Sequence, residues 1–186
     1  MFFGPLIAVD CIECNVSNRP SLSVSRKRQA LRLQFRPEKV RMLFIGEAPP
    51  ASGRFFYQGD SGLYRAIRDV FHEVDHSITD ENFLCTFQRC GCYLIDVCGS
   101  PVDNLDRKPR RAACIAGELL LSRRIRRLQP ESIVSLLRAI RGNIERAASR
   151  ADWHGVILDV PYPGRWARHR EIFTAKLLSH VASLIK

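Results

Sequence analysis

Short apolar runs alternate with helical patterns from residue 40 to the end of the chain. The runs span residues 40–45, 93–97, 132–137 and 155–160, and glycine or proline follows closely after the first, second and fourth. An apolar run of this length that stops at glycine or proline is typical of a buried strand that ends in a tight loop. The pattern therefore predicts four strands.

Helical spacing follows the predicted strands, over residues 61–75, 106–127, about 140–149 and from Trp166 onward. The apolar positions that carry the three longer patterns are Leu63, Ile67, Val70 and Val74, then Ala112, Ile115, Ala116, Leu119 and Leu120, then Phe173, Leu177, Val181 and Leu184. Strands that alternate with helices imply a mainly parallel sheet covered on both faces. We therefore expect one three-layer αβα domain over residues 1–186, with a central four-stranded sheet and residues 1–39 packed on it as an N-terminal extension.

The composition favours a polyanionic partner. The 186 residues carry a net charge of +10, most of it from arginine, and a basic excess of this size points first to nucleic acid. An arginine-rich composition without any such partner would give the same charge. Residues 15–39 are polar and basic and include Arg26-Lys27-Arg28, so we expect a loop there with one short helix.

The N-terminus and the cysteines suggest the compartment. Residues 1–10 are apolar, but they lack the basic region and the long apolar region of a signal peptide, and no stretch approaches the roughly 18 apolar residues of a membrane span. We expect a cytoplasmic protein with no membrane partner. The seven cysteines are an odd number, which favours thiols or metal ligands over a set of disulfides.

Polar candidates stand at the ends of three predicted strands: Glu47, Asp96 and the loop 161–169. The carboxyl ends of parallel strands share one edge of the sheet, where α/β proteins bind their ligands. Glu47 there can act as a general base or stabilise charge, which contributes on the order of 10²–10⁴-fold in rate. The alternative is a glutamate that caps the next turn.

Two loops have the composition of a ligand surface. Three consecutive aromatic residues, Phe55-Phe56-Tyr57, cannot all enter one face of a core from a loop, so at least one is expected to stack on a flat ligand. The alternative is a loop pinned to the core by one or two of the rings. The segment 161–170 combines prolines, aromatic residues and arginines, which suits contact with a phosphate backbone, although it also suits a stiff connection into a helix.

The segment Leu43-Phe44-Ile45-Gly46-Glu47-Ala48-Pro49-Pro50 resembles the first motif of the uracil-DNA glycosylase superfamily, and is most similar to its GEAPG-type branch, often called family 4. The resemblance covers most of the chain from Val40 onward. It implies that Glu47 positions or activates the attacking water and that Gly46 and Ala48 border the base. Residues 57–62 are similar to the F-V-G-R-A-G segment of the branch, which places Tyr57 or its neighbour Phe56 where an aromatic ring stacks on the flipped base.

Two positions depart from the family pattern. Tyr162-Pro163 occupies the place of the second motif, H-P-S, so the histidine that donates to the departing base is replaced by Tyr162, or its role passes to His169. Asp96 stands where the family typically has asparagine. An ionised carboxylate only accepts hydrogen bonds, so it suits the amino group of cytosine better than O4 of uracil, unless Asp96 is protonated or turned away.

The cysteines resemble a cluster-binding pattern. The branch commonly holds a four-iron four-sulfur cluster with a C-x2-C pair near the start and two later cysteines about 16 residues apart, a pattern that Cys11, Cys14, Cys98 and Cys114 match. Zinc is an alternative for four cysteines. No cofactor is required for the chemistry itself.

These observations predict a monomeric, monofunctional DNA repair glycosylase that hydrolyses the N-glycosidic bond of uracil or a related base in DNA and so initiates base excision repair. The residues expected to grip the DNA are Pro161, Pro163, Gly164, Arg165 and Arg168. One alternative is a catalytically inactive nucleic-acid-binding protein on the same fold, which the replacement of histidine by Tyr162 favours. Another is a hydrolase of free nucleosides, which the positive charge disfavours.

Overall fold

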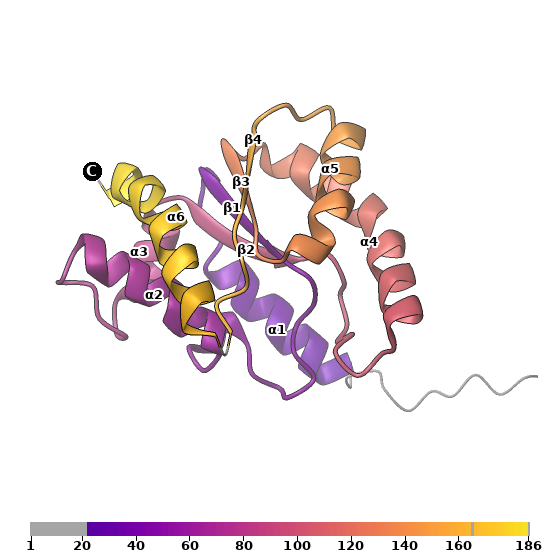
Figure 1. Cartoon of the computed structure of the whole chain (residues 1–186), viewed down its shortest axis with the longest axis horizontal. Helices are drawn as coiled ribbons and strands as arrows, with labels where there is room; N and C mark the ends of the chain where they lie inside the picture. The colour runs from indigo at the N-terminus through magenta and orange to yellow at the C-terminus, as the bar shows by residue number, and fades with distance from the viewer. Residues whose placement is uncertain (1–21, 165, 186) are drawn as a thin grey trace, which may run out of the picture.

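A parallel sheet of four strands lies at the centre of the computed structural model, which describes residues 22–164 and 166–185 (Figure 1). The strands are β1 (Met42–Gly46), β2 (Cys92–Asp96), β3 (Ser132–Ser135) and β4 (Val156–Asp159), in the order β2-β1-β3-β4. Every neighbouring pair is parallel, and all residues of β1 and β2 are buried. The predicted strands and the parallel sheet are confirmed.

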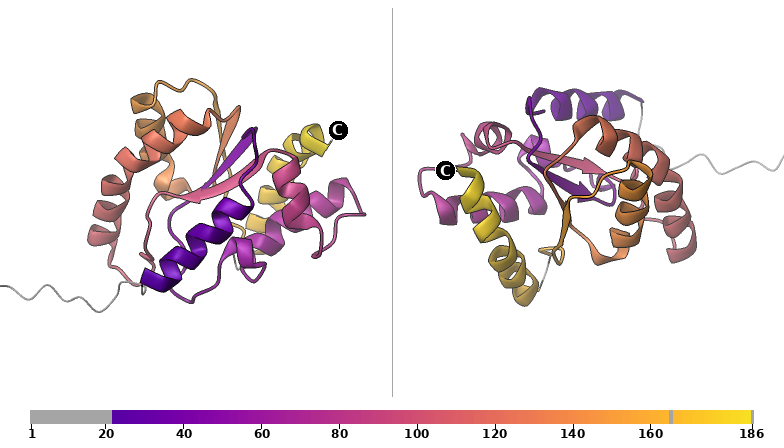
Figure 2. Two further views of the ribbon diagram at one scale, coloured as in Figure 1. Left: turned by 180° about the vertical axis from the view of Figure 1, so that it is seen from behind. Right: turned by 90° about the horizontal axis from the view of Figure 1, so that it is seen from above.

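Helices cover both faces of this sheet. They are α1 (Leu22–Gln34), α2 (Gly62–Val74), α3 (Phe83–Arg89), α4 (Arg107–Leu128), α5 (Arg141–Arg150) and α6 (Ala167–Ile185), with short 3-10 turns η1 (Phe56–Gln58) and η2 (Arg138–Ile140). Helices α4 and α5 lie together on one face, and α2, α3 and α6 lie on the other (Figure 1). Helix α1 crosses the edge strand β2, as the left view of Figure 2 shows. The predicted three-layer αβα fold is confirmed.

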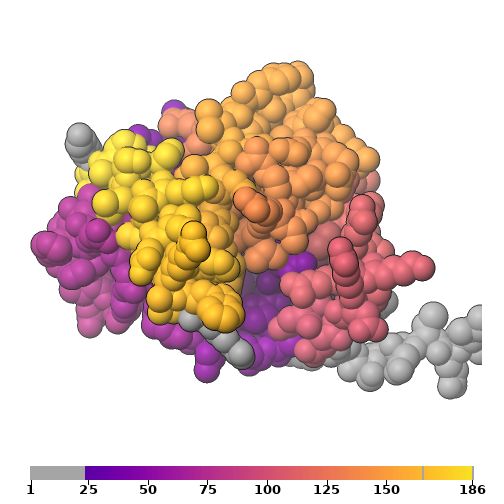
Figure 3. Space-filling model, in the orientation of Figure 1, coloured from indigo at the N-terminus to yellow at the C-terminus, as the bar shows by residue number. Residues whose placement is uncertain are grey.

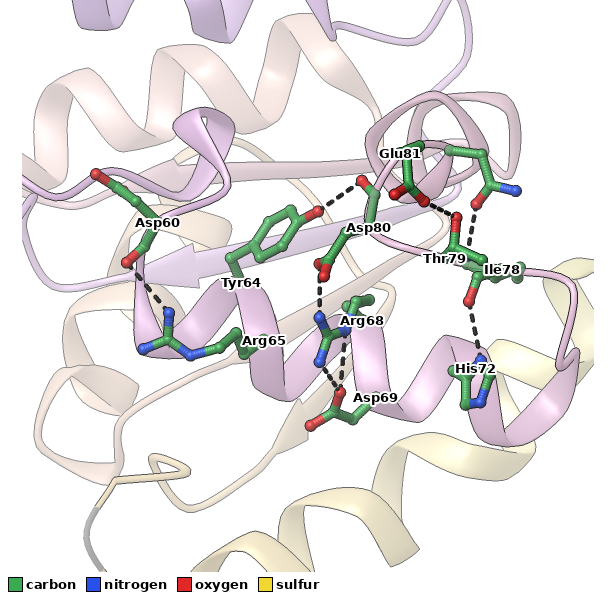
Figure 4. A network of polar contacts seen from close by, with 11 residues as sticks. Asp60, Tyr64, Arg65, Arg68, Asp69, His72, Ile78, Thr79, Asp80 and Glu81 are labelled. Atoms are coloured by element: carbon green, nitrogen blue, oxygen red, sulfur yellow. Dashed lines mark hydrogen bonds and ion pairs between the residues drawn. The ribbon is translucent and has the colours of Figure 1, made fainter.

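The start of helix α2 and its buried face both agree with its sequence. The hydroxyl of Ser61 accepts a hydrogen bond from the backbone N–H of Tyr64, which is the standard N-cap contact, and Ile67 and Val70 are fully buried. Its outer side carries a polar network: Arg68 donates to Asp69 and to Asp80, and the Tyr64 hydroxyl donates to the Asp80 carbonyl (Figure 4). This network fastens the loop between α2 and α3 to the helix.

Helix α4 spans the predicted residues but buries a different face. Ile115, Leu119 and Leu120 remain 49%, 53% and 48% exposed, whereas Glu118 is only 2% exposed. The buried carboxylate of Glu118 accepts hydrogen bonds from Asn143 and Arg146 of α5, at 2.8 Å and 2.7 Å. A polar contact of this kind between two helices does not appear in an apolar pattern, which is why the sequence suggested the wrong face.

Helix α3 was not predicted. It has seven residues, too few to show a helical period, and it contributes Phe83 and Phe87 to an aromatic cluster with Phe44 and Phe71. The short helix expected within residues 15–39 is α1. No helix within residues 22–164 and 166–185 has both the length and the apolar character that a bilayer span requires.

Candidate functional site

A cavity opens at the carboxyl edge of the sheet, where β1 and β2 end. Gly46 and Asp96, the last residues of these strands, are paired in register, and Glu47 follows directly. The cavity has a volume of about 320 Å³. Its lining includes Gly46, Glu47, Ala48, Pro49, Pro50, Phe55, Phe56, Ser61, Leu63, Leu94, Asp96, Asp103, Arg110, Leu136, Leu137 and Tyr162. Figure 3 shows a hollow between the surfaces of α4 and α6, with the segment that follows β1 at its floor.

Glu47 forms a bidentate ion pair with Arg110 of α4, and both residues line the cavity. Nε of Arg110 donates to Oε1 of Glu47 at 2.7 Å, and Nη2 donates to Oε2. The Glu47 side chain is 13% exposed and that of Arg110 is 38% exposed. The carboxylate is thus largely withdrawn from water and held in one orientation, and its hydrogen bond raises the pKa of Arg110.

Asp96 is buried, and one side of its carboxylate faces arginines. Nη2 of Arg32 from α1 donates to Oδ2 of Asp96 at 2.8 Å, and Nη1 of Arg124 donates to the Asp96 carbonyl. Burial raises the pKa of Asp96, and the charges of Arg32, Arg124 and Arg28 oppose that rise. The carboxyl group therefore presents its remaining oxygen toward the cavity.

The aromatic triplet is buried as a whole, although its three rings do not share one face of the core. Phe55, Phe56 and Tyr57 are 2%, 4% and 2% exposed. The loop closes on itself because Asp60 Oδ1 accepts the backbone N–H of Phe55 at 2.7 Å, and a 3-10 turn points successive rings in different directions. Phe55 and Phe56 line the cavity.

Tyr57 does not line the cavity, so its ring is not placed to stack on a base there. Its hydroxyl accepts the backbone N–H of Leu94 at 2.7 Å and donates to the Leu94 carbonyl at 3.1 Å. The ring stacks on Phe35 with centroids 5.8 Å apart, and burial raises the pKa of Tyr57 well above its usual value. Tyr57 thus satisfies the open backbone groups of the edge strand β2, a structural role that the sequence pattern did not reveal.

The loop after β4 contributes one residue to the cavity. Tyr162 lines it, and burial raises the pKa of its hydroxyl, which therefore stays protonated and able to donate. Pro161, Pro163 and Gly164 lie outside the lining, and Pro163 is buried. His169 and Arg168 are exposed on the first turns of α6, and neither lines the cavity. Arg165 lies outside the described residues.

Two of the four cysteines of the predicted cluster lie side by side. Sγ of Cys98 and Sγ of Cys114 are 3.7 Å apart, both residues are buried, and Cys114 Sγ also lies 3.7 Å from Oε1 of Glu47. Burial raises the pKa of Cys98 to about 12. Sulfurs bound to one tetrahedral zinc at about 2.3 Å would stand about 3.8 Å apart, so the pair fits two ligands of a metal.

Cys11 and Cys14 lie outside the described residues, and within residues 22–164 and 166–185 no group of three histidine, cysteine, aspartate or glutamate side chains is placed to hold a metal ion. The cluster therefore stays a prediction.

The sequence analysis missed Arg110 and Arg32. Arg110 stands in the first turn of α4 with Arg107 and Lys108, where cations oppose the helix dipole. This signal marks the whole turn as unusual, although it does not distinguish Arg110 from the other cations there. Nothing in the sequence pairs Arg32 with Asp96, because 64 positions separate them.

A second cavity, of about 600 Å³, adjoins the first and shares Glu47 and Arg110 with it. Arg107 and Arg111 line this second cavity, so its surface is basic.

A family model described as the uracil DNA glycosylase superfamily matches residues 33–183, which includes every described residue of both cavities. No curated protein matches the chain significantly.

Proposed function

The chain belongs to the uracil-DNA glycosylase superfamily, and on that premise we propose that it hydrolyses the N-glycosidic bond of uracil, or of a related deaminated base, in DNA. The observation that carries this proposal is the position of Glu47. Its carboxylate lines a cavity of about 320 Å³ at the strand edge where this fold class binds ligands, next to a buried acceptor, Asp96.

The cavity suits a base that has left the helix. An enzyme that acts on the bond between base and sugar must first extrude the nucleotide and hold the base in a pocket. Phe55 and Phe56 offer aromatic walls, and Asp96 offers a hydrogen-bond acceptor to the edge of the base. A base of the pyrimidine class, about as large as one aromatic side chain, fits this volume.

The chemistry assigned to Glu47 is stabilisation of charge and activation of water. As the bond between C1′ of the sugar and N1 of the base breaks, positive charge develops on the sugar, and a fixed carboxylate nearby lowers the energy of that state. Water then adds to C1′ and gives its proton to the carboxylate, while the base leaves with the bonding electron pair.

DNA is the partner that the charge supports. Arg107 and Arg111 line the basic cavity beside the base pocket, and Arg168 is exposed at the start of α6. Arginines in these places can contact the phosphates of a strand that carries an extruded nucleotide. Binding through such contacts weakens steeply as salt concentration rises.

A metal site on the cysteines is part of the proposal. Cys98 and Cys114 would supply two thiolates, with Cys11 and Cys14 as the other two, and a four-iron four-sulfur cluster would have a structural role. Protein purified without oxygen is expected to be brown and to contain iron and sulfide in equal amounts. Iron-free, folded protein would exclude the cluster, and zinc content would identify the alternative.

The replacement of the second-motif histidine by Tyr162 favours a second candidate, a protein of this fold that binds DNA without releasing a base. Both candidates predict DNA binding, and only the first predicts base release.

The deciding experiment measures base release from end-labelled oligonucleotides that carry one uracil, either single-stranded or opposite guanine or adenine. Alkali after incubation cuts the strand wherever the base is missing. The Glu47→Gln protein tests the assigned residue, and Glu145→Gln, an exposed carboxylate on α5, is the matched control.

Release by the wild type and by Glu145→Gln, with at least a 100-fold loss in Glu47→Gln, would establish the glycosylase. DNA binding with no release of uracil, or of other deaminated bases such as hypoxanthine, would support the inactive binder.

A further inference from the structure

The residues that line the base cavity carry more carboxyl groups than cations. Glu47, Asp96 and Asp103 line it with carboxyl groups, and among the described residues of the lining only Arg110 carries a permanent positive charge. A base that departs from the sugar takes the bonding electrons and becomes an anion. Carboxylates close to an anion oppose its formation, and Arg32 already pairs with Asp96, so a positive group near the bond that breaks would favour departure of the base.

Neither of the residues predicted from the second motif meets this need. Tyr162 lines the cavity, but its hydroxyl is a neutral donor. His169 lies on the exposed first turn of α6 and does not line the cavity. The required charge must therefore come from another element.

Arg110 has the geometry for this role. Two of its nitrogens, Nε and Nη2, hold Glu47, which leaves Nη1 without a partner within the described residues. Because the guanidinium is planar, Nη1 lies on its side away from Glu47, at roughly 5 Å from the carboxylate oxygens. In a pyrimidine nucleotide, O2 of the base is bonded to the carbon next to N1, so O2 also lies close to C1′.

We propose that Arg110 is a catalytic residue that stabilises the departing base. This inference rests on the proposed glycosylase function and adds to it. As the C1′–N1 bond breaks, its electron pair moves onto the base and is shared between N1 and O2, and Arg110 donates a hydrogen bond to O2. Water supplies the oxygen that bonds to C1′, its proton passes to Glu47, and the base anion takes up a proton after release.

The Glu47–Arg110 ion pair then matches the charge separation of the transition state, with the carboxylate beside the positive sugar and the guanidinium beside the negative base. Because both groups are already fixed to each other, little reorganisation is needed as the charges develop. The pair replaces the histidine of the second motif with a group that is charged at every pH of interest.

The test compares two leaving groups in single-turnover excision. One oligonucleotide carries uracil and the other carries 5-fluorouracil, whose anion is intrinsically more stable because fluorine withdraws electrons. The proteins are wild type, Arg110→Gln, Arg110→Lys and Lys108→Gln. Lys108 lies in the same turn of α4 and lines neither cavity, so its variant controls for the loss of one positive charge.

Arg110→Gln is expected to slow release of uracil by about 100-fold or more, the size of effect seen when one preorganised donor is removed from a developing anion. Its effect on 5-fluorouracil is expected to be about tenfold smaller, because that anion needs less stabilisation. Arg110→Lys should regain part of the rate on uracil, and Lys108→Gln should stay within about threefold of wild type.

Each other outcome overturns the assignment. Equal losses on both substrates would mean that Arg110 acts only through the position of Glu47, and an unchanged rate would remove it from the mechanism. Melting temperatures of all four proteins identify any loss of activity that comes from unfolding. If Arg110→Gln is unfolded, the rates of Arg110→Lys on the two substrates decide whether Arg110 has this role. A wild-type protein that releases neither base would overturn the proposed function together with this role.

Discussion

Gly46 and Asp96 face each other at the ends of β1 and β2, and a Cβ atom placed on Gly46 would lie 2.7 Å from Oδ1 of Asp96. Real Cβ atoms essentially never approach another heavy atom so closely, so only glycine leaves room for the carboxyl group at this place. Because Gly46 has no side chain, the carboxyl group of Asp96 on the neighbouring strand β2 can reach the cavity.

Gly46→Ala is expected to push the Asp96 carboxyl away from the cavity and to strain its contact with Arg32. Overpacking of this kind costs about 1–3 kcal/mol of stability. Base release should fall at least tenfold in single-turnover assays, with the loss of stability followed by denaturant unfolding. Gly99→Ala is the control, because a Cβ there meets nothing within 4 Å, and an equal effect of both substitutions would contradict the explanation.

Asp96→Asn is expected to change which base the protein prefers. Asparagine can still accept the hydrogen bond of Arg32 and can donate to O4 of uracil, which a carboxylate repels. Release of uracil should therefore rise by about tenfold relative to any base that presents an amino group at the same edge. Competition between two labelled oligonucleotides measures the ratio, and an unchanged ratio would show that Asp96 does not contact the base.

Tyr57→Phe tests whether this ring is structural. The substitution removes one hydroxyl and leaves both the N–H and the carbonyl of Leu94 without their partner, which is expected to cost about 1–3 kcal/mol. Tyr93→Phe is the control, since Tyr93 is also buried but no hydrogen bond of its hydroxyl is found in the described part of the chain. Equal unfolding free energies for the two variants would refute this role for Tyr57.

Glu118→Gln tests the polar contact between α4 and α5 and has a defined pH dependence. Arg146 lowers the pKa of the Glu118 carboxyl, so the charged form is favoured in the folded state. Its contribution is fully present above the unfolded pKa of about 4.3 and is lost as pH falls through the lower folded pKa. Glu118→Gln should therefore cost about 2 kcal/mol at pH 7 and little at pH 3.

Chemical unfolding at both pH values measures this difference, and Glu145→Gln supplies the control. Glu145 pairs with Arg141 on the exposed side of α5, and such a pair is worth about 0.5 kcal/mol or less. A cost for Glu118→Gln that does not shrink between pH 7 and pH 3 would mean that the lost contact is steric and not electrostatic.

The sequence by itself determined the sheet and the edge at which the candidate site lies. Apolar runs mark the four strands, three of them with glycine or proline close behind, and parallel strands end at the same edge, so Glu47 and Asp96 were expected at one edge of the sheet. Both signals are local and need no knowledge of what the residues contact.

Only the tertiary structure decided the roles of single side chains. The partners of Glu47, Asp96 and Tyr57 are Arg110, Arg32 and Leu94, which lie 63, 64 and 37 positions away along the chain. The buried face of α4 likewise depends on Asn143 and Arg146 of α5. Hydrogen bonds and ion pairs act over a few ångströms, so their partners are set by how helices pack on the sheet, and hydrophobic periodicity carries no information about them.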